Sequence, residues 1–159
     1  ATDFRDPGAV IGALNEAFRT EDHGGKFFTI WYGVYEPSTR LLRYAGAGHP
    51  PSLYFDDPAT TPVPAALEST GPMPGVLSGL TSDTIEQEIA KGSRLFIYSD
   101  GVYELREAAT GRMRTQDDFS ELLFDPSKRN LDEIEATAKA IVADEQFEDD
   151  VSLVQVDFP

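Results

Sequence analysis

The chain has 159 residues, 40% of them hydrophobic and 11% aromatic, which suits one globular domain with a sizeable core and excludes a disordered chain. Its net charge of −15 disfavours binding to nucleic acid or anionic membranes and favours divalent cations or basic protein patches, although solubility alone would also account for it. The absence of Cys excludes disulfides and thiol chemistry, and no apolar run approaches the roughly 20 residues of a membrane span. No signal peptide is visible, so we expect a cytoplasmic protein. Because the first residue is not Met, the start was either processed or cut from a longer chain.

The first half of the chain predicts one helix and three strands. Asp6-Pro7 opens the helix, because Asp is a favoured N-cap and Pro fits the first helical position. Apolar residues then recur on one face at helical spacing: Val10, Ile11, Leu14 and Phe18. The segment 22–25, Asp-His-Gly-Gly, ends the helix as a loop. The predicted strands are 26–36, 41–45 and 52–55, with a hairpin connection at 37–40 and an irregular segment at 46–51.

The second half predicts a long loop, two strands, two helices and a last strand. Residues 56–80 are rich in Pro and Gly and are typical of a loop, whose length is often functional. Thr115 is a suitable cap for a first helix, and Asn130 with Glu133 resembles a capping box for a second. The predicted strands are 83–90, 94–98 and 151–158. The alternation of apolar and polar residues in 83–90 indicates a half-exposed strand, whereas 94–98 is predicted to be buried.

The order of these elements indicates the fold class. Strands come in blocks joined by short turns instead of alternating with helices. This order favours antiparallel pairing and an α+β layered fold, and it argues against a doubly wound parallel sheet. We treat residues 1–159 as a single domain.

Acidic residues stand at two strand ends. Asp100 follows the strand 94–98 and is followed by Gly101, which lets the backbone turn sharply and a ligand approach closely. Asp149 and Asp150 precede the last strand. If the two strands are antiparallel neighbours, these carboxylates share one sheet edge, and hard divalent cations prefer such oxygen ligands. An Asp-Gly pair after a strand is also a common turn, and two carboxylates alone are too few for tight binding of Mg²⁺ or Mn²⁺.

Four segments, in order, resemble the motifs of the PPM/PP2C-type serine/threonine phosphatases of the bacterial SpoIIE/RsbU group. Together they span roughly residues 7–157. They are 28–34 with 42–51 (the hairpin and its Ala-Gly-His-Pro-Pro signature), 71–76 (Gly-x-Pro-Leu-Gly, with an insertion-like departure), 95–104 (Tyr-Thr-Asp-Gly-Val-x-Glu, with Ser99 for Thr) and 149–153 (Asp-Asp-Val-Thr-Leu).

The resemblance implies an α-β-β-α sandwich of two antiparallel sheets flanked by helices. It also implies two Mn²⁺ or Mg²⁺ ions that activate a bridging water for in-line attack on phosphoserine or phosphothreonine. By motif match, Asp100 and Asp149 are metal ligands, while Gly101 and Asp150 flank the site. His49 is either a substrate-side residue or a structural histidine bonded to nearby backbone.

The sequence departs from the family at its start. The family begins with a Gly-Gly-Asp-x-x-Asp segment and an Asp-x-x-Gly-His-Gly segment, both of which supply metal ligands, and neither is present here. The segment 22–25 is scrambled and follows the helix instead of preceding it. We therefore expect the C-terminal two-thirds or so of the domain, without its N-terminal strands, with weak metal binding and weak or no turnover. Open strand edges would favour self-association into a homo-oligomer.

Two functions remain open. The first is a metal-dependent phosphatase that dephosphorylates a bacterial signalling phosphoprotein, such as an anti-sigma-factor antagonist. The second is a pseudophosphatase, a protein-interaction module that holds a partner without chemistry. The two missing segments, if encoded upstream of Ala1 in the parent gene, would favour the enzyme.

Overall fold

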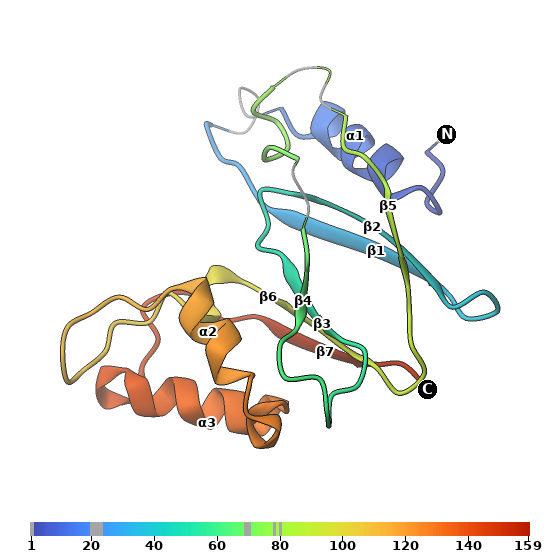
Figure 1. Ribbon diagram of the computed structural model, residues 1–159. Helices are drawn as coiled ribbons and strands as arrows, with labels where there is room; N and C mark the ends of the chain where they lie inside the picture. The colour runs from blue at the N-terminus through green and yellow to red at the C-terminus, as the bar shows by residue number, and fades with distance from the viewer. Residues whose placement is uncertain (1, 20–23, 69–70, 78, 80) are drawn as a thin grey trace. The chain divides into compact units, whose positions relative to one another are not determined.

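The computed structural model describes residues 2–19, 24–68, 71–77, 79 and 81–159 (Figure 1). The chain divides into two compact units, the first formed by Ala1–Pro51 with Glu68–Ile89 and the second by Ser52–Leu67 with Ala90–Pro159. Each unit combines one antiparallel sheet with helices, which confirms the α+β prediction.

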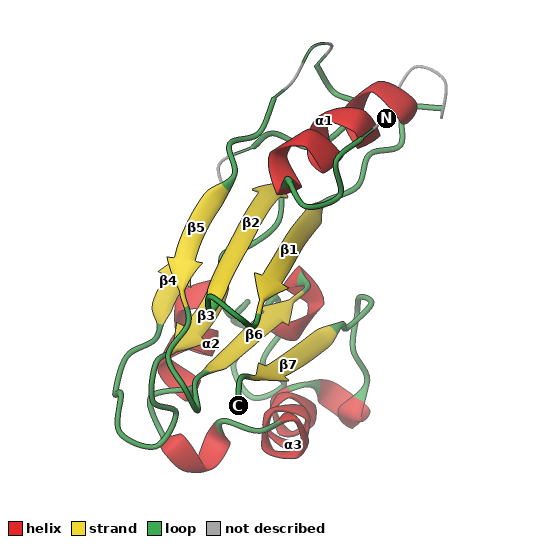
Figure 2. Cartoon of the chain, turned by 90° about the vertical axis from the view of Figure 1, so that its right-hand side faces the viewer, coloured by secondary structure: helices red, strands yellow, loops and turns green. Residues whose placement is uncertain are grey.

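The first unit consists of helix α1 (Pro7–Ala17) packed on a three-stranded sheet (Figure 2). The sheet has the order β1-β2-β5, and its strands are β1 (Ile30–Glu36), β2 (Leu41–Ala47) and β5 (Ile85–Glu88). The helix begins as predicted, because the Asp6 side chain accepts hydrogen bonds from the first free N–H groups. Ile11 is fully buried and packs against Ala45 and Ala47 of β2, so α1 covers one face of the sheet.

Strands β5 and β7 are shorter at both ends than the predicted strands 83–90 and 151–158. Two boundaries of the β1–β2 hairpin differ from the prediction for one reason. Strand β1 begins at Ile30 instead of residue 26, and β2 continues to Ala47 instead of ending at 45. Ile30 pairs with Ala47, and the β2 strand ends there, so the aromatic residues before Ile30 have no ladder partner on that strand. Of the predicted loop 22–25, Asp22 and His23 lie outside the described residues.

The second unit is a four-stranded antiparallel sheet in the order β4-β3-β6-β7, with α2 (Gln116–Leu122) and α3 (Leu131–Ile141). The strands are β3 (Ser52–Phe55), β4 (Ala65–Leu67), β6 (Arg94–Tyr98) and β7 (Leu153–Asp157), and the short 3-10 turns are η2 (Asp100–Val102), η3 (Pro126–Lys128) and η4 (Ala143–Glu145). Its core joins the sheet to both helices through buried apolar side chains: Leu53, Phe55, Phe96, Tyr98, Val102, Phe119, Leu123 and Ile134.

Strand β4 lies inside the segment 56–80 that the sequence predicted as loop. It pairs antiparallel with β3, with Leu67 opposite Ser52. Three residues of Ala-Ala-Leu carry no periodic signal, so only the pairing with β3 makes this segment a strand.

The predicted helix starts of the second unit are both confirmed. Thr115 forms a reciprocal capping box with Asp118 at the start of α2. Asn130 caps α3 by accepting a hydrogen bond from the Glu133 N–H at 3.0 Å. Within the described ranges, every helix is too short or too polar to cross a lipid bilayer.

Candidate metal centre

The site predicted from the sequence lies where β6 ends and β7 begins. The two strands pair antiparallel, with Tyr98 opposite Leu153. The residues that follow β6 and those that precede β7 therefore share one edge of the sheet. This confirms the strand arrangement on which the predicted pairing of Asp100 with Asp149 depended.

Ser99 ties the two chain segments together at this edge. Its backbone N–H donates to the Ser152 carbonyl at 2.9 Å. Its hydroxyl accepts from the Ser152 N–H at 2.9 Å and donates to the Asp150 carbonyl at 3.1 Å. The hydroxyl thus extends the strand ladder by one side chain. Sequence reasoning noted Ser99 only as a replacement for Thr in the motif, and the retained hydroxyl was the one signal of this role.

Asp100 begins the turn η2 directly after Ser99. Its carbonyl accepts from the N–H groups of Tyr103 and Glu104 at 2.9 and 2.8 Å, and its Oδ1 accepts from the Gly101 N–H at 3.0 Å. The side chain is exposed. Within the described part of the chain, Oδ2 receives no hydrogen bond, so that oxygen is available to a cation.

Asp149 is held in a similar way on the opposite segment. Its Oδ1 accepts from the Asp150 N–H at 2.7 Å, and both residues are exposed. Each candidate ligand therefore has one carboxylate oxygen fixed by the following backbone N–H, which limits the rotation of the side chain.

Gly101 permits the two segments to approach closely. A Cβ atom at this position would lie 2.4 Å from the Asp150 carbonyl oxygen and 3.0 Å from its carbon. Any side chain here would push the Asp149–Asp150 segment away from Asp100. The glycine is thus required by packing, in agreement with its prediction as a residue flanking the site.

The donor set suits a hard divalent cation. Carboxylate oxygens are the preferred protein ligands of Mg²⁺, which is commonly held by one or two carboxylates together with waters and substrate phosphates. No cluster of three or more His, Cys, Asp or Glu side chains suited to metal binding occurs among the described residues. Asp100 and Asp149 are of the right type for such a site, but two carboxylates are fewer than the ligands that a divalent cation takes.

Tyr103 adds a neutral group to this negatively charged edge. Burial raises the pKa of its phenol, and the charges of Glu104 and Asp100 raise it further. The ring packs edge to face on Tyr98 with 6.1 Å between centroids. At neutral pH the phenol therefore stays protonated beside Asp100.

His49 belongs to the first unit, whereas Asp100 and Asp149 belong to the second. Its Nδ1 lies 2.8 Å from the Pro50 carbonyl oxygen. Because a carbonyl only accepts, Nδ1 carries the hydrogen, and Nε2 makes no hydrogen bond to the residues that the structure describes. This bond to nearby backbone confirms the structural alternative, while a substrate-side role stays a prediction.

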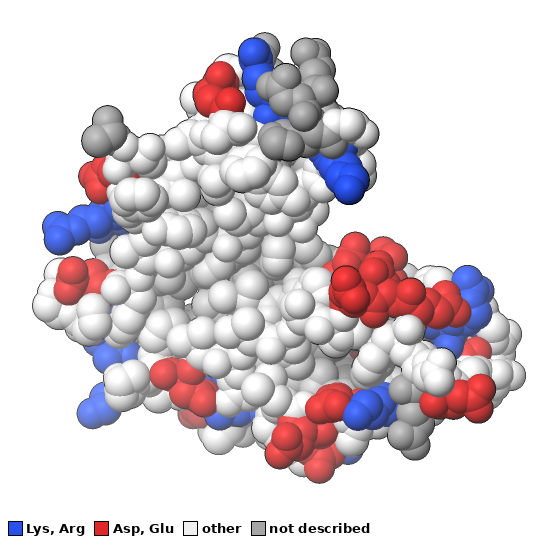
Figure 3. Space-filling model, turned by 180° about the vertical axis from the view of Figure 1, so that it is seen from behind, with Lys and Arg blue, Asp and Glu red and all other residues white. Residues whose placement is uncertain are grey.

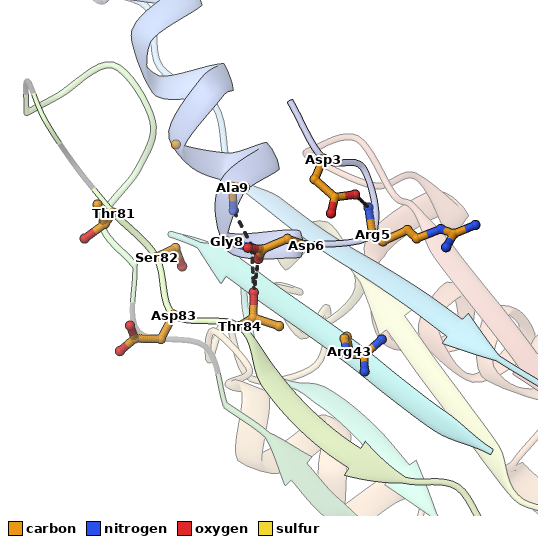
Figure 4. A pocket seen from close by; sticks show the side chains of 11 residues that line it. Asp3, Arg5, Asp6, Gly8, Ala9, Arg43, Thr81, Ser82, Asp83 and Thr84 are labelled. Atoms are coloured by element: carbon orange, nitrogen blue, oxygen red, sulfur yellow. Dashed lines mark hydrogen bonds between the residues drawn. The ribbon is translucent and has the colours of Figure 1, made fainter. Parts of the chain in front are cut away.

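A separate cleft of about 710 Å³ lies beside the start of α1 in the first unit (Figure 4). Two of its three carboxylates are engaged locally: Asp6 accepts from the Thr84 hydroxyl at 2.5 Å and from two helix N–H groups, and Asp3 accepts from the Arg5 N–H at 2.9 Å. The bond from Thr84, followed by that from Ala9, lowers the pKa of Asp6. These contacts make the cleft part of the helix cap.

Acidic side chains gather in separate patches over the surface, as seen from one side in Figure 3. In the sequence, Glu148, Asp149 and Asp150 form an exposed acidic run, and Glu148 pairs with Arg106 at 3.3 Å. The sheet edge with Asp100 and Asp149 therefore carries at least three exposed carboxylates, those of Asp100, Asp149 and Asp150, and such a concentration of negative charge favours cations.

The fold is that of the PP2C-type phosphatase domains. The SiaA-PP2C domain of Pseudomonas aeruginosa matches with a TM-score of 0.80 and 20% identity, covering 98% of this chain and 62% of that chain. The phosphatase domain of SpoIIE from Bacillus subtilis, presoaked with Mn, matches with a TM-score of 0.61 and 16% identity, covering 93% and 63%.

The chain belongs to the SpoIIE family, because the profile of stage II sporulation protein E (SpoIIE) matches residues 1–159. Phosphoserine phosphatase RsbU of Bacillus subtilis (strain 168) is 29% identical over 100 residues, which are 63% of this chain and 29% of RsbU. The chain therefore spans less than a third of the length of that relative. These matches confirm the family and the fold that the four sequence motifs predicted.

Proposed function

We propose that this chain is part of a metal-dependent serine/threonine phosphatase domain and carries the Asp100–Asp149 portion of its metal centre. The observation that carries the proposal is the joining of two motif segments at one sheet edge by the Ser99 hydroxyl and the Gly101 contact. The similarity to RsbU, which is named a phosphoserine phosphatase, supports the reaction class.

The chain's own residues would hold and position the ion. Asp100 and Asp149 would each offer a carboxylate oxygen to Mn²⁺ or Mg²⁺, two ions being expected in the complete domain. Gly101 and Ser99 keep the two segments at a fixed separation, and Asp150 contributes its carbonyl to that contact. When bound, such ions lower the pKa of a coordinated water and polarise phosphoryl oxygens.

The proposed substrate is a phosphoserine or phosphothreonine on a bacterial signalling protein, such as an anti-sigma-factor antagonist, in the cytoplasm. The name of the relative RsbU, phosphoserine phosphatase, supports the phosphoserine group. His49, whose Nε2 makes no hydrogen bond to the described residues, is the proposed substrate-side group in the first unit.

The test is a calorimetric Mn²⁺ titration with turnover of a phosphoserine peptide assayed in the same samples. The chain is compared with Asp100→Asn, and with Asp132→Asn as a control that makes the same charge change at an exposed site in α3. We expect weak binding that Asp100→Asn abolishes and Asp132→Asn retains, with little turnover. Equal binding by all three would mean that Asp100 only forms a turn; the metal site would then fail, while the fold and family would stand.

The alternative, a pseudophosphatase, predicts binding of a phosphoprotein without turnover at any metal concentration. The two proposals separate when the chain is expressed together with the residues that precede it in the parent gene. Turnover that appears with a Gly-Gly-Asp and an Asp-x-x-Gly-His-Gly segment supports the enzyme, whereas binding without turnover supports the module.

Self-association is proposed through the edge of the first sheet. Strand β1 lies at one end of the order β1-β2-β5, so one row of its backbone groups faces away from the described strands. Such edges tend to pair with another chain. Sedimentation over a wide concentration range tests this, and a clean monomer at high concentration would contradict it.

A further inference from the structure

Asn15 is an amide buried inside the first unit. It lies on α1 and is 2% exposed, and a buried amide is stable only when its polar atoms are paired. Its Nδ2 donates to the Leu77 carbonyl at 3.0 Å, and its Oδ1 accepts from the Gly75 N–H at 2.8 Å. One side chain of the helix therefore holds the backbone of a loop 60 residues further along the chain.

The loop 71–77 has few other fixing points toward its end. Val76 and Leu77 are 49% and 56% exposed, so burial holds them weakly, whereas Pro74 is fully buried. The two bonds from Asn15 lie on either side of Val76, at Gly75 and Leu77. Asn15 therefore anchors this end of the loop at two backbone groups, and the neighbouring Glu16 side chain accepts from the Gly79 N–H at 3.1 Å just beyond it.

The beginning of the same loop holds the turn that carries His49. The Gly48 N–H donates to the Gly71 carbonyl at 2.7 Å, and the Gly71 N–H donates to the Gly46 carbonyl at 3.2 Å. Gly48 has a φ of +66°, and a Cβ there would lie 2.3 Å from Met73 Cγ. The loop and the turn thus fit without free space, and a shift of one requires a shift of the other.

We propose that Asn15 is a positioning residue that couples helix α1, through the loop 71–77, to the Gly46–His49 turn and so to the orientation of the His49 ring. A displacement of α1 would then move His49. The consequence for a substrate rests on the proposed function of His49, but the coupling does not.

The experiment measures amide hydrogen exchange by NMR on the whole chain, comparing wild type with Asn15→Ala and Val10→Ala. Val10 is buried on the same helix at 6% exposure, so its truncation removes apolar volume and no hydrogen bond. We expect Asn15→Ala to accelerate exchange at Gly75 and Gly48 at least about tenfold beyond any change in the β1–β2 ladder. Val10→Ala should change these two amides and the ladder together.

The second readout is the His49 imidazole, one of only two in the chain. Its ring nitrogens should report the Nδ1–H form in wild type and a mixture of tautomers in Asn15→Ala, while Val10→Ala keeps the wild-type signal. If Asn15→Ala does not fold, Asn15→Asp replaces it, since it keeps the acceptor for the Gly75 N–H and loses the donor to Leu77.

The outcomes separate cleanly. Exchange at Gly48 that follows the ladder in whichever Asn15 variant folds, with an unchanged His49 signal, would overturn the coupling. Altered His49 signals without any change in the turnover of an active, longer form of the protein would leave the coupling in place and remove His49 from the proposed function.

Discussion

Replacing Arg129 is the sharpest test of what holds the second unit together. Its side chain is 1% exposed, yet in the described structure it makes no ion pair. The guanidinium lies 4.2 Å over the Phe55 ring. It donates to four backbone carbonyls, at 2.5, 3.1, 2.7 and 3.3 Å: those of Leu123, Phe124, Pro58 and Pro62. The loop after β3 and the end of α2 are thus joined by one planar group.

Arg129→Met would keep much of the apolar stem and remove every donor. The bond to Leu123 is buried and the other three are partly buried, so each carbonyl left unpaired costs at most about 1–3 kcal/mol. Relief of the guanidinium's desolvation offsets part of that sum. Burial, the main influence on the Arg129 pKa, lowers it, in line with this desolvation. We expect a net loss of about 3 kcal/mol, or roughly 6–12 °C in Tm for a chain of this size.

Arg129→Lys separates charge from geometry. Lys keeps the positive charge but cannot present a planar fork to four carbonyls, so we expect it to recover less than half of the loss. The control is Arg112→Met, because the Arg112 side chain is 51% exposed and solvent screens its pairs with Glu107 and Asp118, so their loss should change stability little.

The assay is urea unfolding followed by far-UV circular dichroism, which reports on helices of both units. Fluorescence would not serve, because the one tryptophan, Trp31, lies in the first unit. A loss below about 1 kcal/mol for Arg129→Met, no larger than that of Arg112→Met, would refute the idea that the four carbonyls depend on this side chain.

Two further predictions concern the metal edge and the response to acid. Gly101→Ala should weaken Mn²⁺ binding at least about tenfold while the chain stays folded, because the new Cβ would lie 2.4 Å from the Asp150 carbonyl oxygen and push that segment away. Calorimetry measures the affinity, and a wild-type value would contradict the proposed geometry. Hydrogen bonds from Arg112 and then from the Thr115 backbone hold the pKa of Asp118 well below its usual 3.8. The ionised Asp118 therefore contributes its full share of stability above the pKa that Asp118 has in the unfolded chain, and this share is lost as the pH falls toward its lower pKa in the folded chain. Asp118→Asn should reduce the loss of unfolding free energy between neutral and acidic pH. An unchanged loss would count against the pairing of Asp118 with Arg112.

The sequence by itself determined the features that neighbouring residues encode. The helix starts at Asp6-Pro7, Thr115 and Asn130 could be predicted, because a cap is a local hydrogen-bond arrangement within one turn. The end of β6 at Ser-Asp-Gly could be predicted for a similar reason, since the turn is encoded by neighbouring residues. The four motifs in order were enough to predict the family, which the match over residues 1–159 confirmed.

The candidate site was predictable only in part. Asp100 and Asp149 were identified as a pair on condition that their strands were antiparallel neighbours, and the β6–β7 register met that condition. The bridging hydroxyl of Ser99 and the contact of Gly101 with Asp150 were not predictable, because they join residues about 50 positions apart.

Only the tertiary structure decided the elements whose partners lie far away in the chain. Strand β4 exists because β3 pairs with it, and β1 begins where β2 stops offering a partner. Asn15 and Arg129 are polar or charged types that the sequence alone would place on the surface. They are buried because folding brings backbone groups from distant segments within hydrogen-bond distance of their side chains. A local sequence pattern cannot predict which distant segments will lie that close.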